Sequence, residues 1–152
     1  MGRVRARIDV PGQASDAEAL WYDHRRWPAF VDGVKHVARV DGDWPRPGAR
    51  LVSDSEHGGP GRVLLTVVAY EPRAGQTVAI EDERVRGTQR VHFRPHEGGV
   101  TVELERDYEP KDPRLRPALL DRLVVRRPQR ETLERTLRRF AAELAAERDL
   151  PL

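Results

Sequence analysis

The sequence contains no cysteine among its 152 residues. Disulfide bridges, thiolate nucleophiles and cysteine-ligated metal ions are therefore excluded. No apolar run approaches the ~18 residues that a membrane-spanning helix needs, and the N-terminal stretch MGRVRARIDV lacks the apolar core of a signal peptide. We therefore predict a cytoplasmic protein without a transmembrane segment.

Lysine is scarce, because Lys35 and Lys111 are the only two and arginine supplies the other 25 of the 27 basic side chains. The 25 acidic residues are interleaved with these arginines, and the net charge is only +2. This pattern favours a mixed, solvated surface over a basic nucleic-acid-binding one, so no specific nucleic-acid partner is expected. The apolar residues are periodic, which excludes a disordered chain.

The first 33 residues of the sequence predict a strand and two short helices. Val4, Ala6 and Ile8 alternate with arginines, which is the period of a half-buried strand. Ser15, followed three residues later by Glu18, matches a capping box and predicts a helix that ends near Asp23. The segment Trp27-Pro28 then predicts the start of a second short helix, which ends at Asp32-Gly33.

From residue 34 to residue 109 the chain consists of short segments rich in Val, Thr and Leu, separated by glycine and proline turn signals. This spacing is typical of an antiparallel meander. The segment 61–71 is apolar on both of its faces, which makes a homodimer possible. The six predicted strands are 34–41, 49–57, 61–71, 76–85, 88–96 and 100–109.

The C-terminal region has a helical period. One apolar stripe consists of Leu119, Leu120, Leu123 and Val124, and a second consists of Leu133, Leu137, Phe140, Ala141 and Leu144. Pro128 predicts a kink or a break near 127–128, so the last helix should span about 129–147. Because a meander must cover one of its faces, we predict an α+β fold in which a curved, seven-stranded antiparallel sheet wraps around this long helix. The length suits a single domain over residues 1–152.

This order of segments resembles the START-like (SRPBCC) superfamily, and within it the polyketide cyclase/dehydrase and lipid-transport group. The matching stretches are VRARIDVPG, SDAEALWYD, RRWPAFVDGV, VVAYEPRAG, FRPHEGGVTV and the C-terminal amphipathic helix, and they cover nearly the whole chain. The resemblance implies a helix-grip fold. It also implies a cavity between sheet and helix that binds a small hydrophobic or aromatic molecule, lipid- or polyketide-like. No cofactor is expected.

Candidate ligand-binding residues are polar or aromatic side chains in phase with the inward-facing apolar ones. On the strand 100–109 the inward phase of Val102 and Leu104 continues through Arg106 and Tyr108. A guanidinium and a phenol placed in this way could hold a carboxylate, phenolate or carbonyl oxygen. Two of the candidates, Trp27 and Phe30, either plug the end of the core or line the mouth of the cavity. The predicted ligand-binding residues are Trp27, Phe30, Ser55, His57, Tyr70, Arg106 and Tyr108.

Two other classes of function stay open. In a polyketide cyclase or dehydratase, His57, Tyr70 and Arg106 would move protons or stabilise an enolate, although no catalytic residue can be assigned. In an interaction module, the basic C-terminal helix would meet RNA or a membrane surface. A metal site is not predicted, because His92 and His96 on one strand lie roughly 13 Å apart, too far to share one ion.

Overall fold

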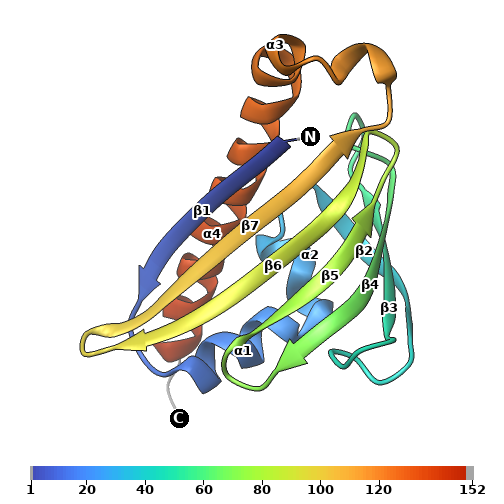
Figure 1. Ribbon diagram of the computed structural model, residues 1–152. Coiled ribbons are helices and arrows are strands. Elements are labelled where there is room, and N and C mark those ends of the chain that lie inside the picture. The colour runs from blue at the N-terminus through green and yellow to red at the C-terminus, as the bar shows by residue number, and fades with distance from the viewer. Residues whose placement is uncertain (1, 150–152) are drawn as a thin grey trace.

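The computed structural model describes residues 2–149, and within them seven antiparallel strands form one sheet in the order β1-β7-β6-β5-β4-β3-β2 (Figure 1). The predicted seven-stranded α+β fold is confirmed. The strands are β1 (Gly2–Val10), β2 (Val34–Asp41), β3 (Arg50–Ser55), β4 (Arg62–Glu71), β5 (Gly75–Glu81), β6 (Val85–His96) and β7 (Gly99–Pro110). The α-helices are α1 (Ala14–Tyr22), α2 (Trp27–Phe30), α3 (Ala118–Leu120) and α4 (Arg127–Arg148), and the other turns are η1 (His24–Arg26), η2 (Pro113–Leu115) and the π-helical η3 (Asp121–Arg126).

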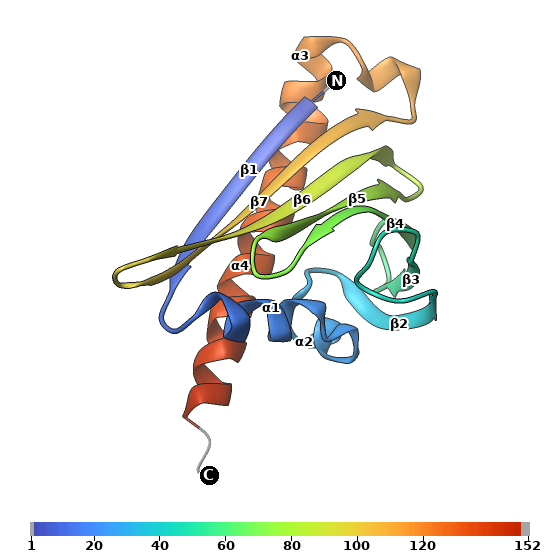
Figure 2. The same cartoon turned by 60° about the horizontal axis from the view of Figure 1, so that its bottom comes forward.

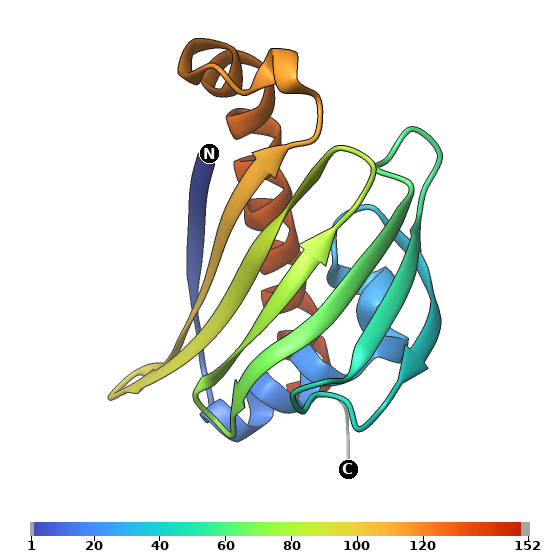
Figure 3. The ribbon, with the colours of Figure 1, turned by 45° about the vertical axis from the view of Figure 1, so that its right-hand side comes forward.

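The sheet curves around the long helix α4, which lies on its concave side together with α1 and α2 (Figures 1 and 3). Figure 2 shows the two edge strands, β1 and β2, on either side of α4. The predicted stripe of α4 faces the sheet, because Leu133, Leu137, Phe140 and Leu144 are all buried. Phe140 packs edge-on against Trp21 of α1, with ring centroids 5.6 Å apart. These contacts form the core.

The hairpin of β6 and β7 fixes which residues meet at the centre of the sheet. Its register runs from Val85 opposite Pro110 to His96 opposite Gly99 without a shift. Gly99 has φ of 147°, and a Cβ there would lie 2.2 Å from the carbonyl oxygen of Val10, so only glycine fits the turn beside β1. In this register Gln89 stands directly opposite Arg106.

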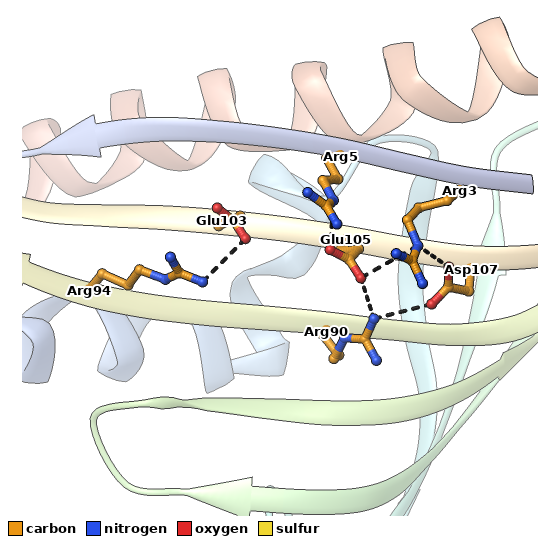
Figure 4. A network of polar contacts seen from close by, with 7 residues as sticks. All are labelled: Arg3, Arg5, Arg90, Arg94, Glu103, Glu105 and Asp107. Carbon is orange, nitrogen blue, oxygen red and sulfur yellow. Dashed lines mark hydrogen bonds and ion pairs between the residues drawn. The ribbon is translucent and has the colours of Figure 1, made fainter.

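The alternate face of these strands carries a network of ion pairs that points away from α4 (Figure 4). Arg3 Nε lies 2.6 Å from Asp107, and Arg5 Nε lies 2.8 Å from Glu105. Arg90 of β6 contacts both carboxylates. Neighbouring residues of a strand point to opposite faces of the sheet. Since Glu105 and Asp107 point outward, Arg106 between them points inward, towards the concave face.

The electrostatic environment of the network favours ionised carboxylates. The hydrogen bond from Arg3 is the largest effect that lowers the pKa of Asp107. Burial alone would raise the pKa of Glu105, but the hydrogen bond and charge of Arg90, together with Arg5, hold it below its usual value. The network therefore depends on both acids being charged.

Helix α1 begins differently from the prediction. Its first residue is Ala14, and the backbone N–H of Gln13 donates to the carboxylate of Asp16 over 3.0 Å. The predicted box of Ser15 and Glu18 is wrong, because the helix begins two residues earlier: Gln13 is the N-cap, and Asp16 accepts from its backbone N–H in the role predicted for Glu18, at the positive end of the helix. Glu18 instead accepts a hydrogen bond from the backbone N–H of Arg73, 2.6 Å away in the β4–β5 turn.

The predicted disturbance near Pro128 takes the form of the π-helical η3, which runs directly into α4. Pro128 lies in the first turn of α4, where its missing N–H is tolerated. The apolar stripe predicted at Leu119, Leu120, Leu123 and Val124 does not join the core, because all four side chains are exposed. Within residues 2–149 no helix is long and apolar enough to cross a membrane.

Candidate ligand-binding pocket

A pocket of about 310 Å³ lies between the N-terminal half of α4 and the concave face of the sheet. A larger hollow of about 580 Å³ lies over the convex face, but it is open and contains no comparable buried charge. The enclosed pocket is therefore the better candidate site. Its apolar walls include Trp21, Trp27, Val34, Val63, Leu65, Ile80, Leu104 and Leu133, and its polar walls include Ser53, Asp82, Gln89, Arg106, Gln129 and Thr136.

Arg106 is the central polar group of this pocket and is only 9% exposed. Its Nε and Nη2 donate to Oε1 of Gln89 over 3.0 and 2.6 Å, and its Nη1 donates to Oε1 of Gln129. Among residues 2–149 no carboxylate forms an ion pair with it within 4.0 Å. Burial lowers the pKa of Arg106 to about 10, although the charge of Asp82 opposes this effect. The side chain is therefore a charged, buried guanidinium held by neutral amides.

Asp82 stabilises the turn between β5 and β6 at one side of the pocket. Its Oδ1 accepts hydrogen bonds from the backbone N–H groups of Arg84 and Val85, at 2.7 and 2.9 Å. The Arg84 side chain in turn donates to the carbonyl oxygens of Gly58 and Gly59, at 2.9 and 3.3 Å. The β3–β4 loop and the β5–β6 turn are thus joined where they border the pocket.

The loop after α2, which also borders the pocket, is joined to α4. The backbone N–H of Asp32 donates to the Thr136 hydroxyl over 3.0 Å, and its carboxylate pairs with Arg135 and Arg139, at 3.0 and 3.1 Å. Trp27 donates its indole N–H to the carbonyl oxygen of Trp21 over 2.8 Å. Only the apolar surface of the Trp27 ring is then left for a ligand.

The structure places two of the seven predicted ligand-binding residues, Trp27 and Arg106, in the pocket lining. Phe30 lies behind this wall in the core, with its ring centroid 5.4 Å from that of Phe140. Ser55 ends β3, and its hydroxyl accepts from the backbone N–H of Gly61 over 2.8 Å.

The other three predicted residues lie outside the lining as well. His57 is exposed in the β3–β4 loop. Tyr70 lies near the β4–β5 turn and packs edge-on against Tyr22, with ring centroids 5.6 Å apart. Tyr108 is fully buried on the concave side, next to Asp121, and burial together with that carboxylate raises the pKa of Tyr108 to about 12.

Sequence reasoning missed the two glutamines that hold Arg106. The signal for Gln89 was available, because a two-residue turn after His96 fixes the hairpin register and sets Gln89 opposite Arg106. Ser53 lines the pocket in the inward phase of Leu51, as the alternation along its strand indicates. No local pattern indicates Gln129, because its contact depends on how α4 sits on the sheet.

Three solved structures have a fold similar to that of this chain. The di-domain ARO/CYC StfQ from the steffimycin biosynthetic pathway aligns with a TM-score of 0.79 at 16% identity, over 97% of this chain and 52% of that one. A START superfamily protein from Mycobacterium smegmatis gives 0.77 at 17% identity, over 95% and 98%. Norcoclaurine synthase from Thalictrum flavum, in complex with dopamine and hydroxybenzaldehyde, gives 0.69 at 13% identity, over 99% and 89%.

At these identities the structural likeness shows the fold alone, and the chain spans about half the length of the di-domain protein. A comparison with curated protein sequences finds no significant match. The family model described as "Polyketide cyclase / dehydrase and lipid transport" matches residues 1–145, which is nearly the whole sequence. The chain therefore belongs to the polyketide cyclase/dehydrase and lipid transport family.

Proposed function

We propose that the chain binds a small apolar or aromatic molecule that carries one anionic or carbonyl oxygen, and that Arg106 anchors this oxygen. The observation that carries the proposal is the buried guanidinium, which lies beside apolar walls of the pocket and forms no ion pair within 4.0 Å with any carboxylate of residues 2–149. Members of this family typically bind hydrophobic ligands, which agrees with the apolar walls.

The hydrogen bonds of Arg106 leave room for a ligand. A guanidinium has five N–H donors, and three of them are used by Gln89 and Gln129. A buried charge without an opposite charge in contact is costly, so an anionic oxygen that accepts from the remaining donors would regain part of that cost. Neutral amide partners hold the guanidinium in place without neutralising it. The site is thus suited to a ligand oxygen with negative charge.

The size of the pocket narrows the class of ligand. Its volume of about 310 Å³ lies at the small end of the roughly 300–1,000 Å³ that is usual for ligand sites. A compact molecule with one or two rings fits this volume better than a long acyl chain. The aromatic ligands of norcoclaurine synthase, dopamine and hydroxybenzaldehyde, are of this compact kind.

The proposal can be tested with two dyes that differ in charge. The anionic aromatic dye 8-anilino-1-naphthalenesulfonate and the neutral dye Nile red are titrated into wild-type protein, Arg106→Leu and Arg138→Leu. Arg138 is exposed on α4 and lies outside the pocket lining, so it controls for the loss of one positive charge. Intrinsic tryptophan fluorescence gives a second signal, because Trp21 and Trp27 line the pocket.

We expect Arg106→Leu to weaken the anionic dye by ~1.5–3 kcal/mol, or about 10- to 150-fold, because a charge-assisted hydrogen bond is lost. Nile red should bind wild type and variant alike, and Arg138→Leu should change neither dye. An equal loss for both dyes would indicate damage to the pocket as a whole. Undiminished binding of the anionic dye would contradict the role of Arg106.

A catalytic role in the same pocket is the second candidate. A carbonyl oxygen that accepts from Arg106 would be polarised, and the guanidinium would stabilise an enolate. Asp82 also lines the pocket, and its Oδ2 is the carboxylate oxygen left to accept a proton, since Oδ1 holds two backbone N–H groups. Asp82→Asn would separate the two functions, because a cyclase or dehydratase would lose turnover while a binding protein would keep its affinity for the anionic dye.

A further inference from the structure

The segment 118–126, made of α3 and η3, has four large apolar side chains in water and its acid in the interior, and only Val125 packs partly against the core. Leu119 and Leu123 are each 67% exposed, Val124 is 52% exposed and Leu120 is 38% exposed. Asp121, in the middle of this stripe, is only 2% exposed. An amphipathic helix of a globular protein normally shows the reverse arrangement.

Polar contacts fix this orientation of the segment. The carboxylate of Asp121 pairs with Arg126 over 3.1 Å and lies beside the buried phenol of Tyr108 on β7. Rotating the segment to bury its leucines would expose this pair and break its contact with the sheet. The exposed apolar side chains are therefore held outward by the fold.

Arginines surround the exposed apolar residues. The segment 113–130 contains six arginines and one aspartate, and that aspartate is the buried Asp121. A surface hollow of about 520 Å³ is lined by Arg122, Arg126, Arg127 and Arg130, together with Glu131 and Glu134. We call these four arginines, with Leu119, Leu120, Leu123 and Val124, the basic apolar surface.

The basic apolar surface lies at the end of the molecule where the pocket is bordered by loops. Figures 1 and 3 show α3 at the same end as the β3–β4 loop and the β5–β6 turn. The first turns of α4, which directly follow η3, supply Pro128, Gln129 and Glu131 to the pocket lining. A partner that contacts this surface would therefore meet the region beside the pocket.

We propose that the basic apolar surface docks on an anionic membrane. Four exposed aliphatic side chains supply the apolar insertion, and the arginines around them supply attraction to lipid phosphates, which are the two contributions that interfacial binding combines. Arginine guanidinium groups bind phosphate oxygens in pairs of hydrogen bonds, and the hollow between Arg122, Arg127 and Arg130 can receive a headgroup. The surface projects from one end of the molecule, a shape that suits a broad bilayer (Figure 1).

Two other partners match the surface less well. RNA recognition by proteins relies on aromatic stacking, and the segment 113–130 contains no aromatic residue. A symmetric dimer would place the same patch on both sides of the interface and bring its arginines together. The exposed leucines are unexplained by RNA binding, and the excess of arginine opposes self-association.

The test is co-sedimentation of the protein with lipid vesicles. Vesicles of phosphatidylcholine alone are compared with vesicles that also contain phosphatidylglycerol, at roughly 50 and 200 mM salt. We expect the wild type to bind the anionic vesicles at low salt and to bind neutral ones at least ~10-fold more weakly. Removing two charges with Arg122→Gln and Arg130→Gln should weaken binding by about 30-fold, at roughly 1 kcal/mol per arginine.

The apolar part is tested by the double variant Leu119→Ser and Leu123→Ser, which should also lose vesicle binding. Val68→Ser is the matched control, because Val68 is a 59% exposed valine on β4, outside the basic apolar surface, and its change should leave binding unaltered. Circular dichroism checks that each variant folds. Titration with 8-anilino-1-naphthalenesulfonate without vesicles should be unchanged in all of them, which separates this proposal from that for the pocket.

Three outcomes would overturn membrane docking. The first is equal affinity for neutral and anionic vesicles, or none for either. The second is a concentration-dependent dimer that the leucine double variant abolishes, which would assign the surface to a second copy. The third is RNA binding that survives about 200 mM salt and depends on the arginines alone.

Discussion

The substitution Gln89→Glu tests the central claim about Arg106, that its charge is buried without adequate compensation. Oε1 of Gln89 lies 2.6 Å from Nη2 and 3.0 Å from Nε of Arg106. Glutamate has the same length and would place a carboxylate oxygen at the same point. The buried, amide-bound guanidinium would then have a counter-ion in direct contact.

The magnitude follows from the pKa of Arg106. Burial lowers it from 12.5 to about 10, which corresponds to about 3 kcal/mol against the charged form. The new carboxylate must itself leave water, so only part of this amount is regained. We expect Gln89→Glu to raise the free energy of unfolding by about 1–2 kcal/mol in urea titrations near neutral pH. The same variant should bind the anionic dye at least ~10-fold more weakly, because Arg106 is already neutralised.

Two controls make this result specific. Gln76 is also buried, but its Nε2 donates to the carbonyl oxygen of Pro45 over 3.0 Å, so Gln76→Glu should destabilise the protein by ~1–3 kcal/mol. Gln89→Met removes the acceptor and should also destabilise it. If Gln89→Glu lowered stability by more than about 2 kcal/mol, or left dye affinity unchanged, the reasoning about Arg106 would be refuted.

Two further predictions concern stability. Leu137 is 1% exposed in the contact of α4 with the sheet, so Leu137→Ala should lower the free energy of unfolding by about 2–5 kcal/mol in urea; a loss below ~1 kcal/mol would contradict the packing described. The folded-state pKa values of Glu105 and Asp107 lie below their ordinary 4.5 and 3.8. The contribution of these carboxylates to the free energy of unfolding is therefore complete above the ordinary values and is lost as the pH falls below them. The midpoint temperature of thermal unfolding should therefore fall between pH 6 and pH 3, and Arg90→Gln should make this fall smaller. A fall of the same size in the variant would show that Arg90 does not stabilise the two carboxylates.

The architecture could be predicted from the sequence because its determinants are local. Glycine and proline turns mark the ends of the strands, and the observed β2, Val34–Asp41, has the predicted bounds. The stripe of Leu133, Leu137, Phe140 and Leu144 identified the helix that covers the sheet. Where the local signal was ambiguous, as between Ser15 and Gln13 at the start of α1, the predicted cap was wrong by two residues.

The pocket was harder to predict because alternation along a strand gives the face of a residue but not its neighbours. Ser53 follows the inward phase of Leu51, but Ser55 ends the strand and turns to Gly61, so the phase no longer applies at His57. Tyr108 does point to the concave side, but η3 covers it there with Asp121. How deep each of these side chains lies in the pocket depends on tertiary packing.

The exposed stripe of α3 and η3 shows the same limit for helices. Period and composition predicted Leu119 and Leu123 as members of one apolar stripe, and both side chains are exposed to the same extent. They could not show that the buried side of this segment is the one that carries Asp121. That arrangement depends on Arg126 and on the phenol of Tyr108, which lies on β7 and not in the segment itself.

Helix α4 connects the pocket to the basic apolar surface. Its C-terminal half packs closely, through Phe140, and is held by the pair of Arg26 and Glu143 at 3.1 Å. Its N-terminal half stands beside the pocket, where Gln129 bridges to Arg106. Gln89 and Arg106 are fixed to each other by strand register, but Gln129 is held by a helix that begins directly after η3. A displacement of that first turn would therefore release one more N–H of Arg106 towards the pocket before it disturbed the sheet. The helix is thus the element through which contact at the basic apolar surface would change the affinity of the pocket for an anionic oxygen.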